Sequence, residues 1–200
     1  MSGAVGKMNI LLAGVGGQGT LVAGRVLGEV ALALGMDVKV SEVHGMSQRG
    51  GSVVTYVRMG ECVHSPLIEP GEADFLLAFE QLEALRWAPY LAEHGTLVVN
   101  RLSIQPLTVS IGAAKYPQNI PESLSNAAGE RARVLSVDAS GLANAAGSTK
   151  SLNIAMLGAM AACSGFERKE FEEALDRVFP QKFRATNRRA FDAGFAAACA

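Results

Sequence analysis

Short apolar runs alternate with longer segments of helical periodicity along most of the 200-residue chain. Apolar runs of four to eight residues that end at glycine or polar residues are typical of strands, whereas longer runs with spacings of three and four are typical of helices. The pattern predicts strands at residues 8–14, 37–43, 73–80, 95–100 and 133–139, and a pair of strands within 52–65 that turns at Met59-Gly60. It predicts helices at residues 20–35, 81–94, 152–163, 167–179 and around 185–198.

This alternation predicts an α/β fold in which helices flank a layered, largely parallel, Rossmann-like sheet. The strand pair within 52–65 would be an inserted β-hairpin, and the C-terminal part would be helical. No repeat or low-complexity linker divides residues 1–200, so we expect a single domain. Residues 1–7 precede the first strand and are expected to form a flexible N-terminal extension, and the stretch from 106 to 121 is expected to be irregular.

Charge and apolar content exclude several classes of partner. The formal net charge of -1 gives no field that would attract the chain to nucleic acid or to an anionic membrane. The longest apolar stretch, from Leu152 to Cys163, is shorter than the roughly 20 residues that a membrane-spanning helix needs. The N-terminus lacks the pattern of a secretory signal. We therefore expect a cytoplasmic protein with neither nucleic-acid nor membrane partners.

Three cysteines, Cys62, Cys163 and Cys199, occur far apart in the sequence and without a CxxC spacing. An odd number of scattered thiols is typical of a reducing compartment. An iron–sulfur cluster normally requires four thiolates in closely spaced runs. The chain is therefore expected to hold no cluster and no other metal of its own.

The sequence GVGGQG stands between the first predicted strand and the first predicted helix. Its glycines and glutamine are Gly14, Gly16, Gly17, Gln18 and Gly19. The spacing GxGxxG permits a tight turn and lets an anionic group approach the positive end of the helix. Glu42, at the end of the second strand, is a candidate for the carboxylate that binds a ribose hydroxyl in dinucleotide-binding folds.

Two interpretations of this glycine-rich loop remain open. The first is a Rossmann-type module that binds NAD or NADP. The second is a tight strand-to-helix turn at an interface, which we favour because the chain has no evident second domain with a substrate pocket and hydride-transfer residues.

A second loop, residues 44–51, follows the second strand and should lie at the same edge of the sheet, where ligand sites gather. Its candidates for an interface or a substrate site are His44, Gln48, Arg49, Gly50 and Gly51. A single histidine is more often structural, and a single arginine is more often a solvated charge. Their combination with two glycines, which permit close contact, favours a recognition surface.

Two further features have a functional and a structural interpretation. Gly24 and Gly28 would permit close packing of the first helix against the chain's own sheet, which we favour, or against another subunit. The basic run at residues 181–191 would meet a phosphate or an acidic partner, or form a solvated helix flank, which we favour. Its cations are Lys182, Arg184, Arg188 and Arg189.

Together, GVGGQGTLVAGRVL, EVHGMSQRGGSV and NIAMLGAMAA resemble the gamma-type domain of the 2-oxoacid:ferredoxin oxidoreductases over nearly the whole chain. The resemblance is closest to the beta subunits of the indolepyruvate branch. Relatives directed to pyruvate or oxoglutarate carry Ser-Tyr-Gly-Pro-Glu-x-Arg-Gly-Gly where this chain has residues 43–51. Gly45, Arg49, Gly50 and Gly51 match that pattern, and His44, Met46 and Ser47 depart from it in the indolepyruvate direction.

The resemblance implies a subunit of an enzyme that converts a 2-oxoacid, here indolepyruvate or another arylpyruvate, to aryl-acetyl-CoA, CO2 and reduced ferredoxin. It implies that thiamine diphosphate, Mg2+ and iron–sulfur clusters are held by a large alpha subunit, that coenzyme A is a substrate, and that ferredoxin is reached through the complex. The chain has neither a Gly-Asp-Gly motif with paired asparagines nor a cluster-binding cysteine series. It is therefore expected to bind no cofactor, to supply no catalytic residue and to be inactive alone.

Overall fold

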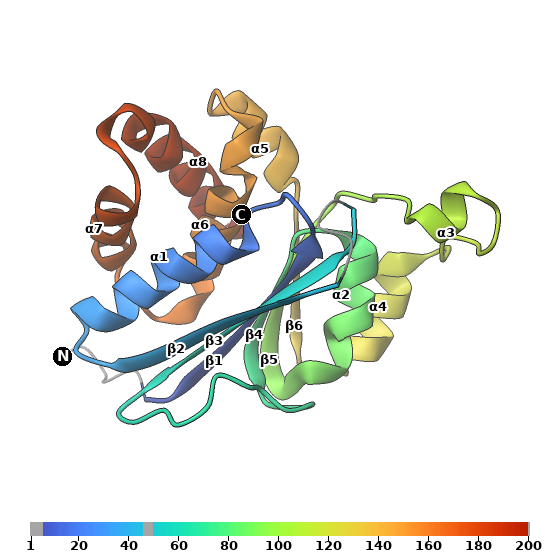
Figure 1. Ribbon diagram of the computed structural model, residues 1–200, viewed down its shortest axis with the longest axis horizontal. Coiled ribbons are helices and arrows are strands. Elements are labelled where there is room, and N and C mark those ends of the chain that lie inside the picture. The colour runs from blue at the N-terminus through green and yellow to red at the C-terminus, as the bar shows by residue number, and fades with distance from the viewer. Residues whose placement is uncertain (1–5, 46–49, 200) are drawn as a thin grey trace.

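The computed structural model describes residues 6–45 and 50–199, and its centre is a six-stranded mixed sheet (Figure 1). The strands are β1 (Met8–Val15), β2 (Asp37–His44), β3 (Ser52–Gly60), β4 (Ala73–Ala78), β5 (Leu91–Asn100) and β6 (Arg133–Val137), in the order β2-β3-β1-β4-β5-β6. Strands β1, β4, β5 and β6 are parallel, whereas β3 is antiparallel to both β1 and β2. The predicted α/β fold, a layered sheet flanked by helices, is confirmed.

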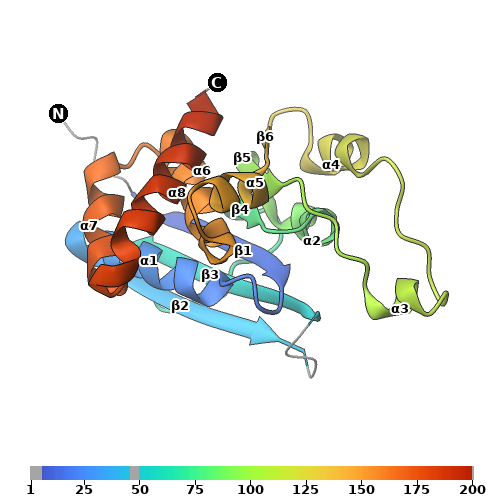
Figure 2. The same ribbon diagram turned by 90° about the horizontal axis from the view of Figure 1, so that it is seen from above.

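Helices cover both faces of this sheet (Figures 1 and 2). The helical elements are α1 (Thr20–Ala33), α2 (Gln81–Trp87), η1 (Ala88–Tyr90), α3 (Leu107–Ser110), α4 (Ile120–Ala128), α5 (Ala139–Ala145), η2 (Thr149–Ser151), α6 (Leu152–Ser164), α7 (Arg168–Val178) and α8 (Gln181–Cys199). The larger core lies between the sheet and the layer of α1, α6, α7 and α8, and the smaller core lies beneath α2 and α4.

The hairpin is not the one that the sequence predicted. Strand β3 runs unbroken to Gly60 and pairs with β2 from His44↔Val53 to Asp37↔Gly60. The residues after Gly60 form no strand, because the chain turns toward the start of β2, where the Val63 N–H donates to the Asp37 carboxylate (2.9 Å). The prediction of two strands within 52–65 was therefore wrong.

Other element boundaries also differ from the prediction. The helix expected at 81–94 ends at Trp87 and is followed by η1 and by β5 from Leu91. Pro89 lies in η1 and lacks the N–H that a continuing α-helix would use. The stretch expected to be irregular contains α3 and the start of α4, and α5 was not predicted. Of the expected N-terminal extension, residues 1–5 lie outside the described residues.

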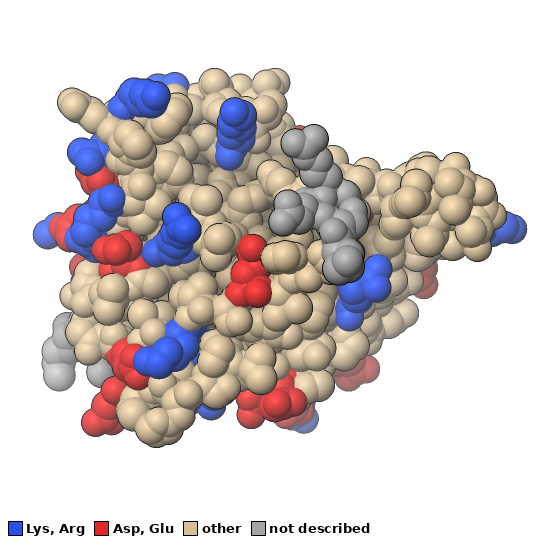
Figure 3. All heavy atoms as spheres, in the orientation of Figure 1, with Lys and Arg blue, Asp and Glu red and all other residues tan. Residues whose placement is uncertain are grey.

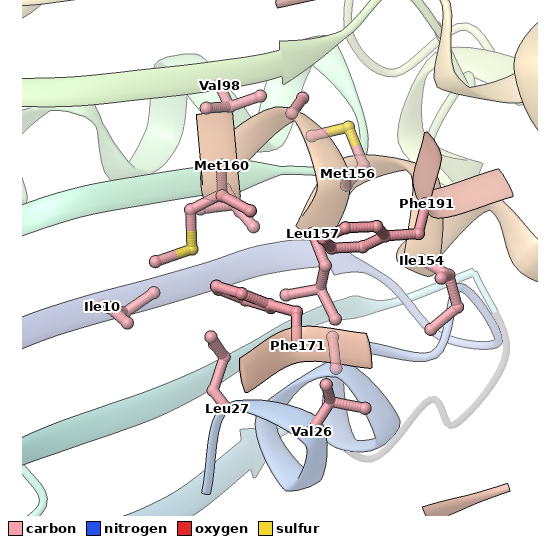
Figure 4. Close-up of a cluster of buried hydrophobic side chains, with 14 of the residues drawn as sticks. Ile10, Val26, Leu27, Val98, Ile154, Met156, Leu157, Met160, Phe171 and Phe191 are labelled. Atoms are coloured by element: carbon pink, nitrogen blue, oxygen red, sulfur yellow. The ribbon is translucent and has the colours of Figure 1, made fainter. Parts of the chain in front are cut away.

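Two glycines bring α6 and α8 into backbone contact within the larger core. A Cβ at Gly158 would overlap the Phe191 carbonyl, and a Cβ at Gly194 would overlap the Ala155 carbonyl. Figure 4 shows Phe191 beside the apolar side chains of α6. Without side chains at these two positions, the helices approach closely enough to bury α6 on nearly all sides.

The glycines of α1 have a different role. A Cβ at Gly24 would lie 3.0 Å from the Thr55 Cγ2 atom on β3, whereas a Cβ at Gly28 would have only an ordinary contact of 3.9 Å with Val40 on β2. Helix α1 therefore packs against the chain's own sheet at these positions. The favoured interpretation, close packing against the sheet, is confirmed at Gly24, whereas Gly28 has room for a methyl group.

The segment from Ile104 to Tyr116, here called the arm, projects from the sheet and carries α3 (Figure 1). Both of its ends are bonded to Glu80, whose side chain is 1% exposed. One oxygen of this carboxylate accepts from the Ile104 N–H (2.9 Å) and from the Tyr116 hydroxyl (2.6 Å). The other oxygen accepts from the Glu83 N–H (2.9 Å) at the amino end of α2. Glu80 thus fixes the base of the arm to the body of the protein.

The contact between α6 and α8 predicts that Gly158→Ala is strongly destabilising, because the added methyl group must displace backbone atoms of α8. We expect a loss of about 3 kcal/mol or more in the free energy of unfolding, measured by urea denaturation. The matched control is Gly28→Ala, which has room for a methyl group and should gain up to about 1 kcal/mol from helix propensity. Equal effects of the two substitutions would contradict the close helix contact.

The contact between Tyr116 and Glu80 predicts a loss of stability at high pH. Burial, and next the hydrogen bond to the Glu80 carboxylate, raise the pKa of Tyr116 from 10.0 to about 12. The folded protein therefore favours the neutral phenol, and this contribution is fully present below pH 10 and is lost as the pH rises from 10 to 12. Denaturation across this range should show a smaller loss in Tyr116→Phe than in the parent protein. Equal losses in the two proteins would contradict this contribution of Tyr116.

Candidate functional site

A hollow of about 360 Å³ lies where the carboxyl ends of β1 and β2 meet the amino end of α1. It is lined by Gly16, Gly17, Gly19, Thr20, Leu21, Glu42, His44 and Val53. The structure thus places three glycines of the first loop and His44 of the second loop in one cavity, as the strand directions predict.

The glycine-rich loop has a backbone that residues with side chains rarely adopt. Gly17 has φ 100 and Gly19 has φ 81, both in the left-handed region. Gly19 also precedes the first residue of α1, and it provides no side-chain cap. The positive end of α1 is therefore available at the hollow, where a carbonyl, a hydroxyl or an anionic group can accept hydrogen bonds.

Gln18 has a structural role in this loop. Its side-chain oxygen accepts from the Val15 N–H (2.7 Å), and its amide donates to the Phe79 carbonyl (3.0 Å) at the end of β4. The same carbonyl accepts from the Asn100 side chain (3.1 Å) on β5. Gln18 therefore joins the turn after β1 to the neighbouring parallel strands.

Two asparagines that the sequence did not single out also support this edge. The Asn153 side chain, on α6, donates to the Gly19 carbonyl (3.1 Å). Asn100 also donates to the Ser140 hydroxyl (3.2 Å), while its own side-chain oxygen is buried with no partner among the described residues. The sequence signal that could have identified them was a polar residue at the end of an apolar strand, for Asn100, and a polar residue at the start of a buried helix, for Asn153.

Glu42 and His44 form the opposite wall of the hollow. One Glu42 carboxylate oxygen accepts from the hydroxyls of Thr20 and Thr55 at 3.2 Å each. His44 is exposed, and its Nδ1 lies 3.2 Å from the Gly45 carbonyl. A carboxylate opposite helix N–H groups suits a ligand or partner segment with both donors and acceptors, such as hydroxyls and amides.

The position of Glu42 differs from that of the acidic residue in a dinucleotide-binding fold. Strand β3 lies between β1 and β2 and is antiparallel to both. In the Rossmann arrangement the second strand is instead directly adjacent to the first. Glu42 therefore lies two strands from the glycine-rich loop, although both face the same hollow.

The second loop touches the first through its paired glycines. The Gly16 N–H donates to the Gly51 carbonyl (2.9 Å), and Gly50 has φ 75, in the left-handed region. Gln48 and Arg49, the other two candidates, lie outside the described residues. The paired glycines thus lie against the glycine-rich loop.

A second hollow, of about 170 Å³, lies beside the paired glycines and is bounded by Glu80, Glu83, Arg86 and the base of the arm. Glu83 is buried and accepts from the Ser52 hydroxyl (2.5 Å) and from the Arg86 guanidinium (3.3 Å). Sequence reasoning missed Glu80 and Glu83. Their signal was two carboxylates three residues apart directly after a buried strand.

The basic run at residues 181–191 is used within the chain. Arg188 forms an ion pair with Asp176, Arg184 donates to the Phe179 carbonyl (3.1 Å), and Arg189 donates to the Ala146 carbonyl near the end of α5. The run is therefore a helix flank with intramolecular partners.

Among the helices that the structure describes, none has the length and apolar content to cross a bilayer.

Comparisons with known proteins agree with this architecture. The family model described as "Pyruvate ferredoxin/flavodoxin oxidoreductase" matches residues 9–197. A relative from Thermococcus kodakarensis named "Indolepyruvate oxidoreductase subunit IorB" is 40% identical, and the match covers 96% of each chain. A second relative, "Ketoisovalerate oxidoreductase subunit VorA" from Methanothermobacter thermautotrophicus, is 27% identical over 94% of this chain but only 36% of its own length.

A solved structure shows the same fold. The gamma subunit of a keto/oxoacid ferredoxin oxidoreductase from Geobacter sulfurreducens is 26% identical, with a TM-score of 0.71 and coverage of 96% of this chain and 98% of that one. The family match includes both loops and the buried helix α6 that carried the resemblance in the sequence. The chain therefore belongs to the pyruvate ferredoxin/flavodoxin oxidoreductase family and is a subunit of a 2-oxoacid:ferredoxin oxidoreductase.

Proposed function

We propose that the chain is the subunit without cofactors of an enzyme that converts indolepyruvate, or another arylpyruvate, to aryl-acetyl-CoA, CO2 and reduced ferredoxin. The observation that carries this proposal is the near full-length match to an indolepyruvate oxidoreductase subunit at 40% identity. The loop at 44–51 supports the same substrate class, because it departs from the pyruvate and oxoglutarate pattern at His44.

The reactive cofactors are assigned to a large alpha subunit. Cys62, Cys163 and Cys199 are each free, and the described residues include no group of three His, Cys, Asp or Glu placed to hold a metal ion. These thiols do not fit an iron–sulfur cluster, which needs four closely placed thiolates. We therefore assign thiamine diphosphate, Mg2+ and the clusters to the partner, with coenzyme A as a substrate and ferredoxin reached through the complex.

The chain's own residues contribute a contact surface. The glycine-rich loop and the paired glycines present backbone groups at close range, and Glu42 and His44 add polar side chains beside them. In this proposal His44, Gln48, Arg49, Gly50 and Gly51 contact the partner subunit or its substrate. The chain acts as one gamma-type domain in the cytoplasm, and the chemistry takes place on groups that the partner holds.

Reconstitution tests the proposed function. The purified chain alone should contain no iron and should show no indolepyruvate-dependent reduction of ferredoxin. The complex with the alpha subunit should show this activity, and it should require coenzyme A. Metal analysis and turnover should be measured on both preparations. Stoichiometric iron and ferredoxin reduction in the isolated chain would overturn the proposal, as would a complex that has no activity toward any 2-oxoacid.

The alternative is a Rossmann-type module that binds NAD or NADP, and the observation in its favour is the GxGxxG turn at the amino end of α1 with Glu42 across the hollow. We expect no saturable binding of either dinucleotide by calorimetry, because β3 separates the strands of the glycine-rich loop and of Glu42. Micromolar affinity that is lost in Gly16→Val would favour the alternative instead.

A further inference from the structure

The arm exposes apolar side chains that nothing else in the described chain covers. Leu107 is 74% exposed and Ile111 is 68% exposed, and α3 has no buried residue. The two side chains are four residues apart on one turn of helix, so they lie on the same side of it. Lys115 is the one charged residue from Ile104 to Tyr116. In Figure 3 the projection at the right is almost entirely uncharged.

The backbone of the arm is folded although it lacks a core of its own. Backbone bonds run from the Ile111 N–H to the Leu107 carbonyl (3.0 Å) and from the Ala114 N–H to the Thr108 carbonyl (3.0 Å). A single turn of helix is not stable by itself in water. The bonds from Ile104 and Tyr116 to Glu80 fix both ends, so the exposed pair is presented at a defined position.

The base of the arm is continuous with the surface that we assign to the partner. Ile104 and Pro106 line the second hollow together with Gly50 and Gly51. A partner that covers the paired glycines therefore lies next to the point where the arm leaves the body.

A longer relative supports another oxidoreductase subunit as this partner. The match to the ketoisovalerate oxidoreductase subunit covers 94% of this chain but only 36% of that protein. In that relative, a related segment is therefore covalently joined to further sequence of an oxidoreductase subunit. The indolepyruvate oxidoreductase subunit is instead matched over 96% of its own length. In that relative the segment is a subunit of its own, which noncovalent contacts must hold to the rest of its enzyme.

We propose that the arm is the docking element that attaches this chain to the large alpha subunit, with Leu107 and Ile111 entering an apolar recess of that subunit. This inference rests on the proposed function. The arm supplies the apolar part of the contact, which is non-directional, whereas the loops supply the polar part.

The test compares two pairs of substitutions in binding to the purified alpha subunit. The double variant Leu107→Ser with Ile111→Ser should bind more weakly, with a dissociation constant raised by roughly tenfold or more. Its melting temperature as a free chain should be unchanged, because neither side chain is buried. The control is Leu32→Ser with Leu67→Ser, which removes two exposed apolar side chains, 61% and 51% exposed, on α1 and in the loop after β3. The control should bind the alpha subunit like the parent chain.

The outcomes separate the two proposals. If the parent chain does not bind the alpha subunit, the proposed function fails. If the parent binds and the arm variant binds equally well, only the docking role of the arm is overturned. The same holds if the free parent chain is a dimer by light scattering and the arm variant is a monomer, since a second copy of the chain would then be the partner. A second double variant, Leu107→Met with Ile111→Val, keeps both side chains apolar and should bind the alpha subunit like the parent chain.

Discussion

The buried carboxylate of Glu80 organises the edge of the sheet on which the candidate site lies. A carboxyl group that is 1% exposed is stable only if hydrogen bonds replace its lost water. Three donors do so here, and they come from the start of α2, from Ile104 and from Tyr116. Two of these donors belong to the two ends of the arm. The hydrogen bonds that satisfy the carboxylate therefore also fix the point where the arm leaves the body. The second hollow and the paired glycines lie directly beside this point.

The residue before Glu80 serves the first hollow in a similar way. The Phe79 carbonyl accepts from Gln18 and from Asn100, and the Phe79 N–H donates to the Ala13 carbonyl. The glycine-rich turn is therefore held from the end of β4, and the Gly16 N–H in turn donates to the Gly51 carbonyl. Two consecutive residues, Phe79 and Glu80, thus hold the glycine-rich turn and the base of the arm.

Sequence reasoning found the features that depend on local patterns. The glycine spacing, the buried α6 and the alternation of strands and helices each follow from residues close together in the chain. The partner of β3 could not be found in this way, because an antiparallel neighbour at 61–65 and one at 37–44 are equally compatible with alternating side chains. The hydrogen bond between Glu80 and Tyr116 joins residues 36 positions apart, and no periodicity reports it. The candidates Gln48 and Arg49 lie outside the described residues, so their roles stay predictions.

The distribution of polar and apolar groups at this edge is suited to a surface that must both bind and orient. Apolar contact provides affinity but little direction, and the exposed pair Leu107 and Ile111 is not among the lining residues of either hollow. Hydrogen-bonding groups provide direction, and they line the hollows at Glu42, Thr20 and the glycine backbone. An apolar pair inside the first hollow would compete with the ligand or partner groups that Glu42 and the end of α1 can bond. The apolar pair lies instead on the arm, which is anchored at both ends. Affinity and direction are thus provided by different groups, and the arm holds the apolar pair at a defined position relative to the hollows.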